Sequence, residues 1–180
     1  ELVKFLEDID LEMADLLREE EFKQRKTIGL IASENVASLA STCLEGSIFT
    51  NKNTEGYPGK RYVSGTKVED KIELLAIERL KQLFGCEHAN LQSGNASIAN
   101  AAVFMGLLSP NDKVLSMSLN DGGHLSHGAP FHLSGKFYEI HQYGVSAKTE
   151  CIDMKEVRRK ALEIMPKMII CGASSYPRQI

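Results

Sequence analysis

Residues 87–108 combine a short, partly apolar segment, a turn of small polar residues and an Ala-rich run. We predict a strand over residues 88–92 and, after the turn, a helix over residues 97–108. This arrangement aims several free backbone N–H groups at one point, and the helix dipole adds to their preference for an anion, usually a phosphate. The Ser97 hydroxyl belongs to the same turn. An ordinary turn with Asn95 or Ser97 as the helix N-cap fits the stretch as well.

Composition and charge exclude several classes of partner. The chain has 180 residues, enough for one domain with a sizeable core. Its net charge of −3 gives no electrostatic reason for binding nucleic acid or an anionic membrane, and no apolar run is long enough to cross a bilayer. We expect no signal peptide. The cysteines have no metal-ligand spacing, so we expect free thiols in a reducing, cytoplasmic compartment: Cys43, Cys86, Cys151 and Cys171.

Hydrophobic periodicity predicts an α/β sheet with helices on both faces. Residues 1–25 have the apolar spacing of an amphipathic helix, interrupted near residues 8–10. Its apolar stripe needs a surface to cover, either on a second subunit or on the chain's own domain. A helix over residues 68–84 should end at Gly85. The other predicted elements are helices over 38–49 and 154–165 and strands over 113–119, 137–145 and 167–173.

Residues 50–65 are a candidate active-site loop. They have no regular period and contain four glycines or prolines, so we predict a long loop. A solvated spacer needs no aromatic residues, yet this loop carries a carboxylate, two phenols and two cations. These side chains are Glu55, Tyr57, Lys60, Arg61 and Tyr62.

A second polar segment, residues 120–128, follows the strand predicted over 113–119. Open α/β sheets place their ligands at the carboxyl ends of strands, so this loop is also a binding candidate. It contains His124 and His127, but this pair lacks a third nearby ligand and predicts no metal site. An imidazole that stacks on a ring or transfers a proton fits better.

Two further polar segments adjoin predicted elements. Residues 174–176 follow the last predicted strand, again at its carboxyl end. In residues 28–35, three polar residues follow an apolar run. We expect either Ser33 or Asn35 to cap the helix that follows.

Four motifs resemble those of the serine hydroxymethyltransferase family, which belongs to the aspartate-aminotransferase-like, fold type I pyridoxal-phosphate enzymes. The resemblance covers essentially the whole chain. It implies an N-terminal helical arm over residues 1–50 and the first part of the large domain over residues 51–180, truncated at the C-terminus. The motifs are Ile-Ala-Ser-Glu-Asn at 31–35, Thr-Asn-Lys-Asn-Thr-Glu-Gly-Tyr-Pro-Gly-Lys-Arg-Tyr at 50–62, Gly-Gly-His-Leu-Ser-His-Gly at 122–128 and Ser-Ser-Tyr at 174–176.

The resemblance implies pyridoxal 5′-phosphate as cofactor and names the residues around it. His124 matches the imidazole that stacks on the pyridine ring, and Ser174 matches the hydroxyl beside its phenolic oxygen. The turn that matches the phosphate cup consists of Asn95, Ala96 and Ser97. Asn53 and Ser33 complete the cofactor-binding set.

The resemblance also names residues for the amino acid and for tetrahydrofolate, the co-substrate. Glu55 matches the general acid/base on the substrate hydroxyl and reaches in from a neighbouring subunit, which implies a homodimer or homotetramer. Tyr62 lies beside substrate and folate, and Ser33 contacts the amino acid. Glu55, His124 and Tyr62 therefore form the expected catalytic set. The folate wall consists of Leu119, Gly123, His124 and Leu125.

Several positions depart from the family pattern. The family usually has Tyr where this chain has Asn53 and Val63, Ser-Gly where it has Asn95-Ala96, and Cys-Glu near Thr66-Lys67. These departures favour a paralogue, such as an aldolase or transaldolase that acts on a β-hydroxy amino acid without folate.

The chain begins at Glu1 rather than Met and reaches Ile180 just after a predicted strand, so we expect both ends to be cut. The resemblance places the Schiff-base lysine, the aspartate that pairs with the pyridine nitrogen and the substrate-carboxylate arginine beyond residue 180. The first hypothesis is a fragment of an enzyme that interconverts serine and glycine with tetrahydrofolate, inactive by itself. The folate-independent paralogue and a catalytically silent relative are the alternatives.

Overall fold

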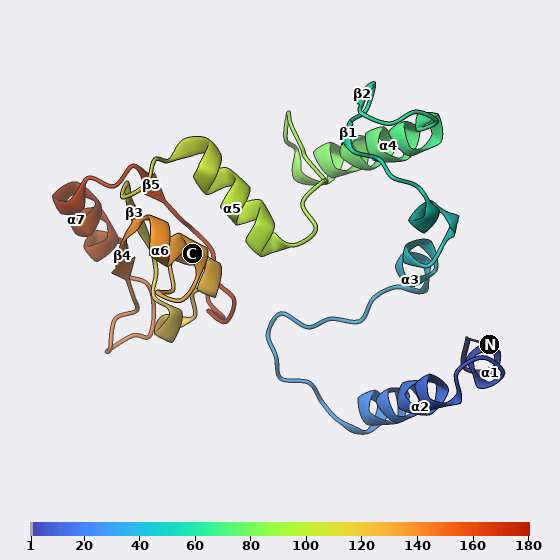
Figure 1. Cartoon of the computed structure of the whole chain (residues 1–180). Helices are drawn as coiled ribbons and strands as arrows, with labels where there is room; N and C mark the ends of the chain where they lie inside the picture. Colours follow the sequence, from blue (N-terminus) through green and yellow to red (C-terminus); the bar gives the residue numbers. More distant parts are fainter. Residues whose placement is uncertain (1) are drawn as a thin grey trace. The chain divides into compact units, whose positions relative to one another are not determined.

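The computed structural model describes residues 2–180 and divides the chain into two compact units. One unit ends at Val36 and the other begins at Ala37 (Figure 1). The boundary that the family resemblance implies at residue 50 stays a prediction. All four cysteines carry free thiols, as predicted. Within the described residues, no helix is both long enough and apolar enough to cross a membrane.

The first unit consists of α1 (Leu2–Glu7) and α2 (Leu11–Lys26), so the predicted interruption near residues 8–10 is confirmed. Asp10 causes the restart, because its Oδ1 atom accepts the Met13 N–H at 3.0 Å and caps α2. Ala14 is fully buried in this unit. Most large apolar side chains of both helices are more than half exposed, so their stripe is uncovered within the unit.

The second unit begins with α3 (Leu39–Glu45) and a 3₁₀ turn, η1 (Ile48–Asn51). The helix predicted over 38–49 is therefore interrupted after Glu45. Ser38 caps α3, because its Oγ atom accepts the Ser41 N–H at 3.2 Å. The prediction that Ser33 or Asn35 caps this helix was wrong, since Ser38 lies directly before the first turn and offers the same kind of acceptor.

A small hairpin and a long helix follow. The two-residue strands β1 (Gly56–Tyr57) and β2 (Lys60–Arg61) pair antiparallel inside the segment predicted as a loop. Helix α4 (Lys67–Phe84) confirms the predicted helix over 68–84. Gly85 ends it in the left-handed conformation with φ 62°, which suits a residue without a Cβ atom.

The central structure is a parallel sheet, and its order β4-β3-β5 places β3 in the middle. These strands are β3 (Lys113–Met117), β4 (Glu139–Tyr143) and β5 (Met168–Ile169). Both pairs are parallel, with Lys113 opposite Glu139 and Val114 opposite Met168. The helices of this region are α5 (Ala96–Leu107), α6 (Leu133–Phe137) and α7 (Met154–Ile164).

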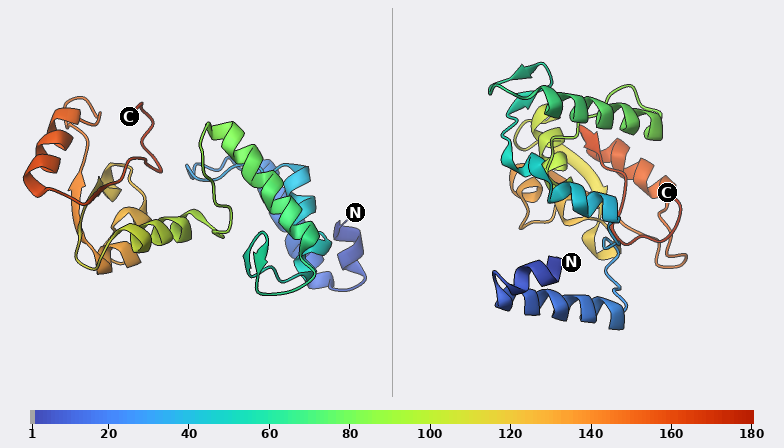
Figure 2. Two further views of the ribbon diagram at one scale, coloured as in Figure 1. Left: turned by 90° about the horizontal axis from the view of Figure 1, so that it is seen from above. Right: turned by 90° about the vertical axis from the view of Figure 1, so that its right-hand side faces the viewer.

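Alternation along β3 divides the core between the two faces of the sheet. Val114 packs with Phe104 of α5 and with Tyr138. Its neighbour Leu115 points to the opposite face, where Val157 and other residues of α7 cover it. Figure 2 shows α5 and α7 on either side of the strands. The predicted α/β sheet with helices on both faces is confirmed.

All four predicted strands differ from the structure, and the one predicted over 113–119 ends at Met117 because a 3₁₀ turn begins at Leu119. Residues 88–92 form no strand. Asn90 explains part of this, because its Oδ1 atom accepts the Gln92 N–H at 2.9 Å and replaces a ladder bond. The strand predicted from residue 137 begins at Glu139, because Phe137 still belongs to α6. The strand predicted over 167–173 retains regular pairing only at β5.

Candidate functional site

The loop after β3 contains two short turns, η2 (Leu119–Asp121) and η3 (Leu125–His127), separated by a pair of glycines. Gly122 has φ 109°, and its carbonyl accepts the N–H groups of Ser174 at 2.8 Å and Ser175 at 3.1 Å. A Cβ atom on Gly123 would lie 2.3 Å from the Met117 carbonyl oxygen. The bonds to Gly122 bring the segment after β5 against the loop after β3, as expected for carboxyl ends of parallel strands.

His124 lies directly before η3 and caps it with its own ring. The Ser126 backbone N–H donates to His124 Nδ1 at 3.1 Å, and the Ser126 hydroxyl lies 2.7 Å from the same atom. Since a backbone N–H can only donate, Nδ1 is unprotonated. This contact assigns the tautomer with the ring proton on Nε2. Asn100 completes the chain of bonds, because its Nδ2 atom donates to Ser126 Oγ at 2.7 Å.

His127 packs against His124, with ring centroids 5.6 Å apart and an interplanar angle of 61°. Its Nδ1 atom is buried and has no hydrogen-bond partner among residues 2–180. Burial lowers the pKa of His127, and the neighbouring His124 lowers it further. Both effects favour the neutral form of the His127 ring. In the described part of the chain, no group of three or more His, Cys, Asp or Glu side chains is arranged to hold a metal ion.

Asn95 caps α5, since its Oδ1 atom accepts the Ile98 N–H at 2.9 Å. The capping interpretation of this turn is therefore confirmed. The first intrahelical bond runs from the Ala99 N–H to the Asn95 carbonyl at 3.0 Å, which leaves the N–H groups of Ala96 and Ser97 ahead of it. Capping by Asn95 and anion binding by these two N–H groups are compatible, because they use different donors.

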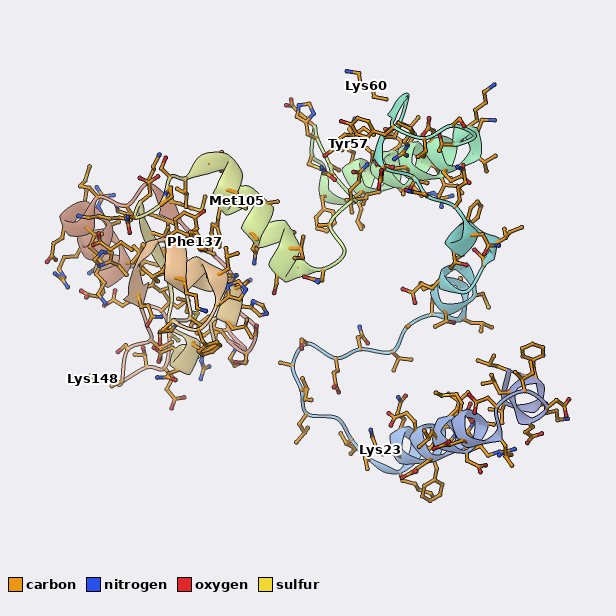
Figure 3. The ribbon with its side chains drawn as sticks, viewed as in Figure 1. Lys23, Tyr57, Lys60, Met105, Phe137 and Lys148 are labelled. Atoms are coloured by element: carbon orange, nitrogen blue, oxygen red, sulfur yellow. The ribbon has the colours of Figure 1, made fainter. Side chains whose placement is uncertain are left out.

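The segment over 50–65 folds around the Arg61 side chain, which is only 5% exposed. Its Nε atom donates to Asp70 Oδ1 at 2.7 Å, and its Nη2 atom donates to Glu73 Oε2 at 2.6 Å. Hydrogen bonding from Arg61 lowers the pKa of Asp70, so this carboxylate stays ionised. The loop is thus held to α4 by charge-assisted bonds. Figure 3 labels Tyr57 and Lys60 on the hairpin above that helix.

Glu55 lies in this loop with its backbone paired and its side chain exposed. The Glu55 N–H donates to Asn53 Oδ1 at 3.1 Å, and the Glu55 carbonyl accepts the Tyr62 N–H at 3.0 Å. The Tyr62 side chain is 87% exposed. Asn53 and Glu55 border a cavity of about 620 Å³, whose apolar wall is formed by Phe49, Ile72, Ala76 and Leu91.

Comparison with known proteins decides the family. A family model described as serine hydroxymethyltransferase matches residues 6–180. The chain belongs to the serine hydroxymethyltransferase family.

Curated relatives with the name serine hydroxymethyltransferase are about 50% identical to this chain over the aligned residues. The protein from Coprothermobacter proteolyticus is 54% identical over 175 residues, which cover 97% of this chain and 42% of the relative. Those from Methanospirillum hungatei JF-1 and Nostoc punctiforme are 51% and 49% identical, over 99% and 98% of this chain and 43% and 41% of their own lengths. The chain therefore spans about two fifths of the relatives that it matches.

The structure brings some of the residues expected from the serine hydroxymethyltransferase resemblance together. Leu119, Gly123, His124 and Leu125 share one loop, and the Gly122 carbonyl joins that loop to Ser174. The bond between Asn100 and Ser126 connects the same loop to α5, whose first turn contains Asn95, Ala96 and Ser97.

Other expected residues lie elsewhere. Asn53, Glu55 and Tyr62 belong to the segment around Arg61, and within residues 2–180 no hydrogen bond joins that segment to the His124 loop. Ser33 belongs to the first compact unit, where the Glu34 N–H bonds to the Ile31 carbonyl in a turn.

Sequence reasoning missed Asn100 and Ser126, the two polar residues that join α5 to His124. One signal was available, because His-Leu-Ser occurs at 124–126 and again at 132–134. In the second copy, the Ser134 N–H donates to His132 Nδ1 at 3.2 Å, and this histidine caps α6. The repeated tripeptide is thus a capping motif in both places.

Proposed function

We propose that this chain is part of a serine hydroxymethyltransferase that interconverts serine and glycine, with tetrahydrofolate as the one-carbon carrier. One observation carries this proposal beyond family membership. Direct hydrogen bonds join the loop of His124 to Asn100 of α5 and to the segment at Ser174, at the carboxyl edge of a parallel sheet. Sites for phosphate-bearing cofactors lie at such edges in open α/β folds.

The residues at this edge fit pyridoxal 5′-phosphate. The N–H groups of Ala96 and Ser97 and the Ser97 hydroxyl suit its phosphate, because they are donors at the positive end of a helix. The ring of His124 suits the flat pyridine ring, and Ser174 offers a hydroxyl from the adjoining segment. When bound, the cofactor supplies an electron sink for bond changes at the amino-acid α-carbon.

The His124 ring is suited to stacking because the Ser126 bonds hold its orientation. Both bonds from Ser126 go to Nδ1, which leaves the Nε2–H outside this pair of bonds and available to a ligand. The close approach of Gly123 to the Met117 carbonyl keeps bulk away from this edge of the sheet. We propose that Leu119, Gly123 and Leu125 form part of the folate wall beside His124.

Glu55 is proposed as the acid/base that holds and moves the proton on the substrate hydroxyl. Its side chain is exposed while its backbone is paired on both sides, which suits a group that serves a ligand outside its own loop. The family pattern has it serve the active site of a neighbouring subunit, so we propose a homodimer or homotetramer in the cytoplasm. Tyr62 and Ser33 are proposed to contact substrate from the same assembled site, and Asn53 to belong to the cofactor shell.

The test is Glu55→Gln in the full-length protein. We expect cofactor and glycine binding to persist while hydroxymethyl transfer falls about 10²-fold or more, because a positioned acid/base is removed. The matched control is Glu87→Gln, an exposed glutamate outside both candidate regions, which should retain normal turnover. Near-normal transfer by Glu55→Gln would exclude Glu55 from proton transfer.

A folate-independent aldolase or transaldolase is the second candidate. Asn53 favours it, because the family usually has a tyrosine at this position and the amide here bonds to the Glu55 N–H. An assay of a β-hydroxy amino acid with and without tetrahydrofolate separates the two activities. Cleavage of that substrate in the absence of folate, with no serine–glycine exchange in its presence, identifies the paralogue. Loss of both reactions, with cofactor binding absent, identifies a catalytically silent relative.

A further inference from the structure

We propose that Arg61 is a positioning residue that fixes the direction of the Glu55 side chain. This inference rests on the proposed role of Glu55 as acid/base. Its starting point is the Nη1 atom of Arg61, which donates to the Thr54 carbonyl at 2.7 Å and to the Gly56 carbonyl at 2.6 Å. These carbonyl groups belong to the residues immediately before and after Glu55, so one guanidinium nitrogen holds the peptide unit that precedes Glu55 and the one that follows Gly56.

The guanidinium is itself fixed by α4. Asp70 accepts from Nε and Glu73 accepts from Nη2, and both carboxylates are largely buried, with side chains 20% and 16% exposed. Asp70 uses its second oxygen to accept the Gly59 N–H at 3.0 Å. The planar fork of arginine makes such a set of bonds in one geometry, whereas the single ammonium of lysine does not.

Gln92 adds a second support from the segment before α5. Its Nε2 atom donates to Glu73 Oε1 at 2.8 Å and to the Gly56 carbonyl at 2.9 Å. Gly56 itself has φ 96°, and a Cβ atom at this position would lie 2.5 Å from the Lys60 carbonyl oxygen. The backbone after Glu55 is therefore fixed by hydrogen bonds and by the lack of space for a side chain.

Four hydrogen bonds hold the backbone at and beside Glu55, while the Glu55 carboxylate is not used in holding it. Its own N–H and C=O groups bond to Asn53 and to Tyr62, and the two flanking carbonyls bond to Arg61. Within residues 2–180, the Glu55 carboxylate accepts no hydrogen bond. A backbone fixed in this way sets where the Cβ atom points and limits the region that the carboxylate can reach.

The experiment compares Arg61→Lys, Glu55→Gln and the double variant in the full-length protein. If Arg61 acts through Glu55, Arg61→Lys should lower kcat about 10-fold or more, with KM for serine and cofactor affinity changed less than about 3-fold. In the Glu55→Gln background the same change should have almost no further effect on kcat. Arg79→Lys, an exposed arginine of the same helix, is the matched control and should retain the parent kcat.

Amide hydrogen exchange provides a readout independent of activity. In Arg61→Lys, the amides of Glu55 and Tyr62 should exchange about 10-fold faster or more, while those in the middle of α4 keep their protection. Asp70→Asn removes one charge that fixes the guanidinium and should give a smaller change of the same pattern. If Arg61→Lys does not fold, the same exchange measurement is made on Asp70→Asn.

The possible results separate this inference from the proposed function. Normal turnover by Glu55→Gln would remove the proposed role of Glu55, and the inference about Arg61 with it. A strong loss in Glu55→Gln, together with an equal further loss on adding Arg61→Lys, would leave the proposed function intact and overturn the inference. Unchanged exchange at Glu55 and Tyr62 in the lysine variant would overturn it as well.

Discussion

Asn100 Nδ2 lies 2.7 Å from Ser126 Oγ, and this hydrogen bond joins α5 to the loop that carries His124. The Ser126 side chain is fully buried, so its hydroxyl bonds only to protein groups. It accepts from Asn100 and donates to His124 Nδ1, whose acceptor role is fixed by the backbone N–H of Ser126. A single hydroxyl therefore connects Asn100 of α5 to the imidazole in the candidate cofactor site.

Ser126→Ala should destabilise the protein by about 1–3 kcal/mol, because it leaves the Asn100 amide without its acceptor in a partly buried position. The matched control is Ser116→Ala. Ser116 is also fully buried, but its hydroxyl has no hydrogen-bond partner among the described residues. Removing it should be neutral or slightly stabilising. Urea unfolding of both variants measures the difference, and equal effects would show that the Ser126 bonds contribute little.

His127→Gln should reduce the dependence of stability on acid pH. The folded-state pKa of His127 is lowered by burial and by His124, so the unfolded state binds the proton more readily. The stabilisation from the neutral ring is then present above the ordinary histidine pKa of about 6.5 and is lost as the pH falls below it.

For one proton, this slope cannot exceed about 1.4 kcal/mol per pH unit. Urea unfolding between about pH 7.5 and pH 5 measures it in the parent, in His127→Gln and in His88→Gln, a variant of an exposed histidine. We expect the slope to be smaller only in His127→Gln. A slope that is the same in the parent and in His127→Gln would contradict the prediction.

Gly123→Ala should destabilise the protein by about 1–3 kcal/mol, typical of inserting a methyl group where there is no room. The added Cβ atom would lie 2.3 Å from the Met117 carbonyl oxygen and 2.8 Å from that of Ser118, and backbone atoms cannot move aside as a side chain can.

Gly106→Ala is the control and should have the opposite sign. Gly106 lies in α5, and a Cβ atom there would contact nothing within 4 Å. Alanine should therefore stabilise this helix by about 0.5–1 kcal/mol. Midpoints of chemical unfolding compare the two variants, and a stable Gly123→Ala protein would mean that the loop after β3 can shift.

Asn95→Ala should cost about 1 kcal/mol, because it removes the oxygen that caps α5. Asn95→Ser restores both a capping oxygen and the residue type usual in the family, so its stability should remain close to that of the parent. Thermal unfolding distinguishes the two. If both variants lose stability equally, Asn95 contributes through something other than its cap.

The elements that could be predicted from the sequence are those with local causes. Helix α4 follows from its apolar period and from Gly85, and the start of α2 follows from Asp10, which caps it three residues away. The segment over 88–92 shows the opposite case. A strand needs a partner, and there the side chains of Asn90 and Gln92 bond instead to the loop around Arg61.

The same distinction applies to the candidate site. His124 and Ser174 were each predicted to follow the carboxyl end of a strand, and the structure joins their segments through the Gly122 carbonyl because these strands are parallel. The pairing of Asn100 with Ser126 depends on how α5 packs, which no local pattern indicates. For Arg61, the sequence indicated a charged loop, but its partners Asp70 and Glu73 lie on a helix that the loop must first reach.

The bonds from Ser174 and Ser175 to the Gly122 carbonyl also limit the order in which a ribosome can complete this edge. The two serines follow Gly122 by roughly fifty residues, and a nascent chain grows by about 5–20 residues per second. The Gly122 carbonyl therefore lacks these two donors for several seconds after it is synthesised. β4 is synthesised earlier and can pair with β3 during that interval. The His124 loop therefore acquires its final neighbours only near the end of the synthesis of this segment, and a translational pause between β4 and β5 would prolong the time it spends without them.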